Sequence, residues 1–159
     1  MINPRRCGHS GGVRARSIDE APAAEPGTFT RCNLGELSLA EVRAHGGDGV
    51  IRFARVADAV AFAGGCNFID YAELPPGASI GRHRHADDEE ELYLVLEGAG
   101  TMWLDGEEIA VRGGDLMRNR PGGEHGLRNT GTRLLRLFVI ELRASLRGRD
   151  DDRRARGVP

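Results

Sequence analysis

Two histidines, His83 and His85, are separated by a single arginine and could hold a metal together. Residues two apart on a β-strand project from the same face, so both imidazoles can reach one point in space. A strand is indicated here because turn-forming Pro-Pro-Gly at 75–77 precedes the pair and an apolar, β-prone run at 92–96 follows it. The pair therefore predicts a metal position at one face of a sheet.

A run of five carboxylates at 87–91 follows the histidines, and most members of such a run form a solvated acidic turn. Glu91 differs because it begins the apolar strand and shares its side with Tyr93, whereas the leucines of that strand take the other side. If the Glu91 side lines the interior, its carboxylate joins the imidazoles. Glu89 has the same parity but lies nearer the turn, and Glu90 points the other way.

A third histidine, His125, lies far along the chain, where a sheet folded on itself can bring it beside the first two. Three histidine nitrogens and one carboxylate oxygen suit divalent transition metals such as Fe, Mn, Ni, Cu or Zn and disfavour Ca and Mg. Four protein ligands leave up to two positions of an octahedral shell open for substrate or oxygen. The predicted cofactor is thus one divalent transition metal, whose identity stays open.

Four further side chains are candidates to act on a substrate. Arg118 and Arg120 share parity on one expected strand, and if that face looks inward they would favour a carboxylate or phosphate group. Solvated, outward-facing arginines are the alternative. Tyr93 is a candidate for hydrogen bonding to a metal-bound ligand, with simple packing as its alternative. Tyr93 and Glu89 are also the candidates to assist proton transfer as catalytic residues.

The elements that must position these residues are short. From residue 50 onward, apolar or alternating runs separated by turn residues predict strands at 50–56, 67–74, 80–85, 91–96, 101–104, 108–111, 116–119, 125–129 and 134–142. These runs leave no room for crossover helices, so we expect an all-β antiparallel sandwich or barrel. Asp105-Gly106 predicts a two-residue hairpin turn. The capping box at 38–41 predicts a short helix that Gly46-Gly47 would end.

The length of 159 residues, with 40% hydrophobic and 29% charged positions, fits one globular domain. Residues 1–28 are rich in Gly, Pro, Ala and Arg without periodicity, which predicts a flexible arm. The globular domain is expected over residues 29–143, and a flexible charged tail over residues 144–159. No run approaches the roughly 18 apolar residues of a membrane span, and the first residues lack the apolar centre of a secretory signal. We therefore expect a cytoplasmic location and no membrane partner.

Composition excludes several chemistries. The chain contains no lysine, so Schiff-base or pyridoxal chemistry on a lysine amine and a P-loop lysine are excluded. The three cysteines are widely spaced and form no Cys-x-x-Cys pair, which predicts neither a disulfide framework nor a thiolate zinc site. The arginine-rich ends lack interleaved aromatic residues, so no nucleic-acid partner is expected.

Two segments carry a family resemblance. Residues 77–85, Gly-Ala-Ser-Ile-Gly-Arg-His-Arg-His, with Glu91 and Gly98 beyond them, resemble the first conserved motif of the cupin family. Residues 114–125, followed by Asn129, resemble the second. The resemblance implies a small single-domain cupin, with a double-stranded β-helix (jelly-roll) barrel and a short N-terminal helix or arm. It also implies that one metal is held by His83, His85, Glu91 and His125.

The sequence departs from the family pattern at two places. Five residues separate His85 from Glu91, against three or four in the family. A longer turn or a bulge could absorb the extra residue, and Glu89 and Glu90 stay open as alternative ligands. In the second motif, Arg120 stands where the family has its first proline, while the spacing from glycine to histidine is preserved.

The leading functional interpretation is a metal-dependent cupin enzyme that acts on a compact polar metabolite. Its reaction would be either oxygenase chemistry or redox-neutral isomerisation or condensation, and the resemblance suggests specialised-metabolite or sugar pathways. A non-catalytic metal- or ligand-binding cupin is the alternative, because one fold hosts many functions. The expected partners are a small-molecule substrate, anionic if the two arginines face it, and a second copy of the chain in a homodimer.

Overall fold

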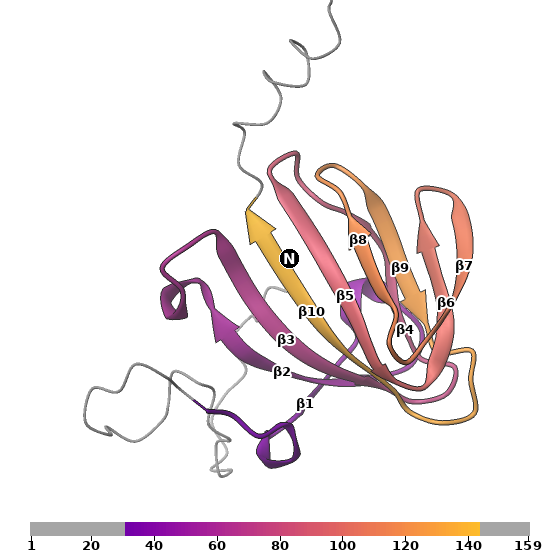
Figure 1. Cartoon of the computed structure of the whole chain (residues 1–159). Helices are drawn as coiled ribbons and strands as arrows, with labels where there is room; N and C mark the ends of the chain where they lie inside the picture. Colours follow the sequence, from indigo (N-terminus) through magenta and orange to yellow (C-terminus); the bar gives the residue numbers. More distant parts are fainter. Residues whose placement is uncertain (1–30, 144–159) are drawn as a thin grey trace, which may run out of the picture.

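Ten β-strands make up most of residues 31–143, the part of the chain that the computed structural model describes (Figure 1). The strands are β1 (Ala40–Val42), β2 (Ile51–Asp58), β3 (Cys66–Leu74), β4 (Ser79–Arg84), β5 (Glu89–Glu97), β6 (Ala99–Leu104), β7 (Glu107–Arg112), β8 (Leu116–Asn119), β9 (Glu124–Arg128) and β10 (Leu135–Arg143). Short 3₁₀ turns occur at η2 (Leu34–Glu36), η3 (Ala44–Gly46) and η4 (Ala59–Ala61). The predicted arm at 1–28 and tail at 144–159 lie outside the described residues.

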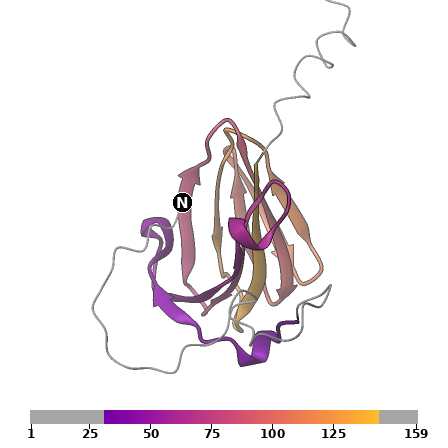
Figure 2. The same ribbon diagram turned by 90° about the vertical axis from the view of Figure 1, so that its left-hand side faces the viewer.

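The strands form two antiparallel sheets that face each other (Figure 2). One sheet has six strands in the order β1-β2-β3-β10-β5-β8, and the other has four in the order β4-β9-β6-β7. The connection from β3 to β4 and that from β4 to β5 each cross between the sheets, as in a jelly roll. The all-β jelly-roll expectation is therefore confirmed, and each of the nine predicted runs corresponds to one of the strands β2 to β10.

The interior is filled from the inward faces of both sheets. Along β5 and β10 burial alternates with a period of two, as expected for strands with one covered face. The buried apolar side chains form one cluster that includes Ile51, Leu74, Tyr93, Val95, Met102, Leu127, Leu135, Leu137 and Val139. Among the buried polar side chains, Glu91 and His125 lie beside Tyr93 in this interior.

Two local predictions have different outcomes. The hairpin at Asp105-Gly106 is confirmed, because both residues have positive φ (45° and 97°) and join β6 to β7. The helix expected after the capping box at 38–41 is wrong. Ala40–Val42 forms strand β1, paired with Ile51–Phe53 of β2, since pairing with the edge of a large sheet outweighs a weak local capping signal.

Among residues 31–143, no helix has the length and apolar character that crossing a membrane requires.

Candidate metal centre

Four side chains from both motifs converge on one point inside the barrel. The Nε2 of His125 lies 3.0 Å from the Nε2 of His85 and 3.1 Å from the Nε2 of His83. The Oε2 of Glu91 lies 3.0 Å from the Nε2 of His125 and 3.3 Å from that of His85. One ligand atom from each residue fits within 4.8 Å of all the others, so the four could hold one metal ion.

The two sheets each contribute to this cluster. His83 on β4 pairs directly with His125 on β9, and the backbone N–H of His85 donates to the carbonyl of Gly123, which extends the same pairing beyond the end of β4. Glu91 comes from β5 in the opposite sheet. The centre therefore forms only when the sandwich closes, with three histidines from one layer and the carboxylate from the other.

The distances fit a metal-binding arrangement. Two nitrogens held about 2.1 Å from one ion lie about 3.0 Å apart at right angles and about 3.4 Å apart at tetrahedral angles. The observed separations of 3.0 and 3.1 Å around the His125 nitrogen match the right-angle case. The Oε2 of Glu91 is buried with no aligned hydrogen-bond donor, although the Nε2 atoms of His125 and His85 lie within 3.3 Å of it. A cation would satisfy this oxygen.

Contacts behind the rings orient the histidines. The Nδ1 of His83 lies 2.9 Å from the carbonyl oxygen of Gly81. A carbonyl only accepts, so Nδ1 carries the proton and the Nε2 lone pair points to the cluster. The Nδ1 of His85 faces Glu141 at 3.6 Å and Glu89 at 4.0 Å, on the far side of its ring from the other ligands. Both rings thus present Nε2 for coordination.

Electrostatics favour a neutral His83 and an ionised Glu91, which are the protonation states that a metal site needs. Burial lowers the pKa of His83 to about 3, with His45 and His125 adding to the effect, so His83 is neutral near pH 7. Burial alone raises the pKa of Glu91, but its contacts with His125 and His85 outweigh this and lower the pKa to about 2. For His85, burial lowers the pKa, and the Glu91 and Glu141 carboxylates raise it by more. Glu91 is therefore an anion held among imidazoles.

A small cavity of about 30 Å³ lies against Glu91. Its polar lining consists of His45, Asp70, Glu91 and Tyr93, and apolar side chains such as Phe53 and Phe68 form the rest. Burial, followed by the nearby Glu91 carboxylate, raises the pKa of Tyr93 well above its ordinary value, so its hydroxyl keeps its proton. Asp70 is bound by Arg55, with the Nε to Oδ1 distance at 2.5 Å. The cavity has room for a compact group only.

His45 is a residue of this site that sequence reasoning missed. Its ring lies parallel to that of His83, with centroids 3.6 Å apart and planes 5° apart. Burial lowers the pKa of His45 to about 4. The sequence gives little signal for His45, because the residue lies between a capping box and Gly46-Gly47, a pattern that indicates the end of a short helix.

The carboxylates at 89–91 point to alternate sides of strand β5, as expected for successive residues of a strand. Glu91 is 4% exposed, whereas Glu90 faces outward and accepts a hydrogen bond of 2.8 Å from the Nε of Arg118. Glu89 lies behind His85 with Glu141, so it does not line the cavity. Of the three carboxylates left open by the sequence, only Glu91 joins the cluster of three histidines.

The substrate-binding expectation for Arg118 and Arg120 is not met by their positions. Both side chains are exposed, while Met117 and Asn119, which alternate with them, are buried. The parity of β8 is set by its pairing with β5, in which Asn119 is opposite Glu91. The arginine face is therefore the outer face of the sheet, where Arg118 pairs with Glu90.

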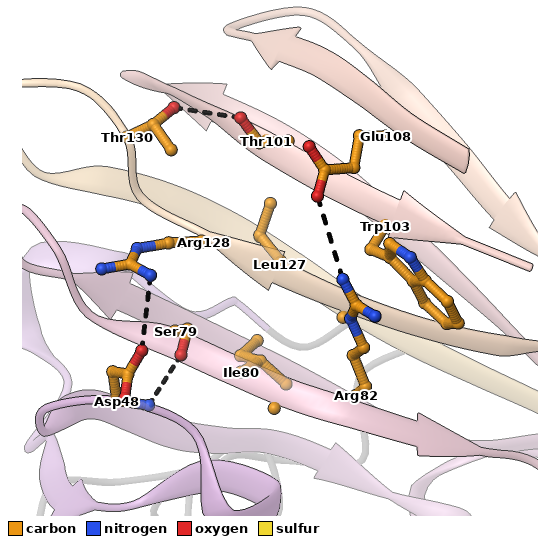
Figure 3. A pocket seen from close by; sticks show the side chains of 12 residues that line it. Asp48, Ser79, Ile80, Arg82, Thr101, Trp103, Glu108, Leu127, Arg128 and Thr130 are labelled. Atoms are coloured by element: carbon orange, nitrogen blue, oxygen red, sulfur yellow. Dashed lines mark hydrogen bonds and ion pairs between the residues drawn. The ribbon is translucent and has the colours of Figure 1, made fainter. Parts of the chain in front are cut away.

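A larger hollow of about 290 Å³ lies on the outer face of the four-stranded sheet (Figure 3). The guanidinium group of Arg82 lies 4.1 Å over the Trp103 ring and 3.8 Å from Glu108, and Arg128 lies 3.5 Å from Asp48. Trp103 pairs with Gly126, whereas His125 has the opposite parity and points inward. None of the four candidate ligands lines this hollow, so it is separate from the metal centre.

Comparisons with known proteins agree with this architecture. A family model described as a cupin domain matches residues 70–141. An oxalate-binding protein of Thermotoga maritima is 30% identical over 95 residues, which cover 60% of this chain and 78% of that protein. Two further relatives are matched over 53% and 42% of their own length, so the chain spans about half of each. The chain belongs to the cupin family.

Solved structures show the same fold. The crystal structure of a predicted oxalate decarboxylase from Thermotoga maritima superimposes with a TM-score of 0.67 at 26% identity, covering 70% of this chain and 96% of that one. The polyketide cyclase RemF from Streptomyces resistomycificus gives a TM-score of 0.60 at 21% identity, covering 74% and 81% of the two chains. The second likeness concerns the fold alone.

Proposed function

We propose that this chain is a metal-dependent cupin enzyme that acts on a compact polar metabolite in the barrel interior. One observation carries the proposal: the Oε2 of Glu91 is buried without a hydrogen-bond partner at the point where three histidine Nε2 atoms meet. Leaving a buried carboxylate oxygen unsatisfied is costly, and a cation is the partner that this donor set suits. His83, His85, Glu91 and His125 would hold it.

The donor set also indicates the charge of the substrate. Three neutral imidazoles and one carboxylate leave a divalent ion with one uncompensated positive charge, which favours an anionic ligand such as a small carboxylate. Bound there, the ion would supply Lewis-acid polarisation and a template for the substrate. The oxalate-binding relative supports a compact carboxylate, since its name describes a ligand of this chemistry.

The chain's own residues then have distinct tasks. The Tyr93 hydroxyl, which keeps its proton beside Glu91, can donate a hydrogen bond or a proton to a ligand in the cavity. Phe53 and Phe68 supply apolar lining to the cavity. Fe in the purified protein would favour oxygenase chemistry, and Zn or Mn would favour isomerisation or condensation.

A non-catalytic binding protein is the second candidate. It is favoured by two observations: the relative at 30% identity is an oxalate-binding protein, and the cavity beside Glu91 holds only about 30 Å³. In this case the metal and its small ligand would be bound without turnover.

Elemental analysis of protein purified without chelator tests the proposal. We expect about one divalent transition metal per wild-type chain and a large loss of metal in the His85→Ala variant. Full metal content in that variant, or none in the wild type, would contradict the site.

Oxygen uptake and mass spectrometry of products then separate the two candidates. The loaded protein is incubated with a panel of small carboxylates, hydroxy acids and sugars. Turnover that falls in Tyr93→Phe while the metal is retained supports the enzyme. Ligand binding without any product supports the binding protein.

A further inference from the structure

His45 has a backbone conformation that an L-residue rarely adopts. Its φ and ψ are 47° and 37°, in the left-handed region. Among residues 31–143 the other non-glycine residue with positive φ is Asp105, whose hairpin turn requires it. No hairpin turn accounts for His45, which lies in the short turn η3. Such a conformation persists only where surrounding contacts hold it, and these residues concentrate at functional sites.

The contacts that hold His45 are built by glycines on both sides. A Cβ at Gly81 would lie 2.2 Å from the carbonyl oxygen of His45, and a Cβ at Gly47 would lie 2.3 Å from that of Ser79. Because neither glycine has a side chain, η3 lies directly on β4. This close approach places the His45 ring flat against His83, whose Nε2 belongs to the metal cluster.

His45 lines the cavity beside Glu91. Of the other polar residues there, Asp70 is bound by Arg55 and Glu91 belongs to the metal cluster, which leaves His45 and Tyr93 to contact a ligand. Within residues 31–143, the nitrogens of His45 make no hydrogen bond. A neutral imidazole offers one N–H donor and one lone pair. His45 therefore brings an unused hydrogen-bonding group into a small, mostly apolar space.

We propose that His45 is a substrate-contacting residue: one of its ring nitrogens hydrogen-bonds a small anionic ligand bound in the cavity beside the metal cluster. This inference rests on the proposed function, because the ligand would lie between His45 and the metal held by the four ligands. The strained turn then has a role, since it presents the imidazole edge to the cavity and keeps the ring face on His83.

The test uses the full chain loaded with Co²⁺ and azide as the anionic probe, with binding followed by visible absorption. His45→Phe keeps an aromatic ring over His83 but removes both nitrogens. We expect it to bind Co²⁺ within about twofold of the wild type and azide about tenfold or more weakly, as for loss of a hydrogen bond to a charged group. His45→Asn restores a donor and tolerates positive φ, so it should recover part of the azide affinity.

The possible outcomes separate the two proposals. If the wild type binds no Co²⁺, the proposed function fails and the inference fails with it. If Co²⁺ is bound but azide binds the wild type and His45→Phe equally, or does not bind the wild type at all, the inference alone is overturned. Should His45→Phe fail to fold, His45→Asn is compared with His45→Gly, which also accepts positive φ. Equal azide affinities in that pair would overturn the inference.

Discussion

The Nε2 of His125 lies 3.0 Å from the Oε2 of Glu91, although the two side chains belong to different sheets. His125 is fully buried and Glu91 nearly so, which means that water cannot screen the carboxylate. The contact places the carboxylate ligand against the paired strands β4 and β9, which carry His83 and His125. Metal affinity should therefore depend on this carboxylate rather than on its neighbours in the acidic run.

Replacing Glu91 with glutamine tests this dependence. The side chain keeps its size but loses its charge, so we expect metal affinity to fall at least about tenfold. Glu90→Gln is the matched control, because Glu90 pairs with Arg118 on the outer face, and its effect should stay within about twofold. Isothermal titration with Zn²⁺ or Co²⁺ measures both. A larger loss in Glu90→Gln would mean that the strand register differs from the one described.

Gly81→Ala should displace the turn that carries His45. The new Cβ would lie 2.2 Å from the His45 carbonyl oxygen and 2.9 Å from the Gly47 nitrogen, both backbone atoms that cannot rotate away. We expect a loss of about 1–3 kcal/mol in the free energy of unfolding, as for other forced contacts. Gly64→Ala is the control, since a Cβ there meets nothing within 4 Å. Urea unfolding of both variants measures this loss. An unchanged midpoint for Gly81→Ala would refute the close approach of Gly81 to the backbone of His45 and Gly47.

Asn129→Ala should be strongly destabilising although Asn129 is not a member of the metal cluster. The Nδ2 of Asn129 donates to the carbonyls of Leu74 and Arg133 at 2.7 Å each, and its Oδ1 accepts from the N–H of Gly131 at 2.9 Å. Removing the amide leaves these backbone groups without partners, which should cost about 3 kcal/mol.

Thr130→Ala is the neighbouring control for Asn129→Ala. Thr130 is exposed, and its hydroxyl contacts that of Thr101 at 3.2 Å, so its loss should cost less than about 1 kcal/mol. Thermal unfolding of the two variants gives the comparison. Similar melting temperatures would show that Asn129 does not hold the loop.

Stability of the metal-free protein should fall on mild acidification. His45 and His83 have pKa values lowered from 6.5 to about 4 and about 3, so below pH 6.5 the unfolded chain binds protons that the folded one does not. Their contribution is complete above pH 6.5 and is lost as the pH falls toward those values. Glu91, lowered from 4.5 to about 2, adds a loss of the same sign below pH 4.5.

Urea unfolding between pH 7.5 and about 4 measures this dependence, with His45→Phe as the comparison. The variant should show a shallower loss between pH 6.5 and about 4, because it has no imidazole to protonate at that position. His85 has the opposite sign: its raised pKa gives a contribution that is present below 6.5 and lost as the pH rises through the raised value. Identical slopes in the two proteins would contradict the burial of His45.

Local sequence patterns were sufficient to predict the positions of strands β2 to β10 and of the hairpin turn at Asp105-Gly106. Alternation of apolar and polar residues and the spacing of turn residues located β2 to β10, because burial of one face imposes a period of two on each strand. Asp105-Gly106 was sufficient for its hairpin, since few residue pairs tolerate two positive φ values. The two histidine-containing motifs likewise supplied the candidate ligands.

The tertiary structure decided two things that the sequence left open: whether residues 40–42 form a helix or a strand, and which face of each strand points inward. β1 forms in place of a helix because an available sheet edge outweighs a capping box. The pairing of β5 with β8 and β10 turns Glu91 inward and Arg118 outward, a choice that alternation alone cannot make. His45 reaches His83 only because Gly47 and Gly81 meet in space. Sequence patterns thus determine which residues share a face, whereas the packing of the two sheets decides which face is the interior.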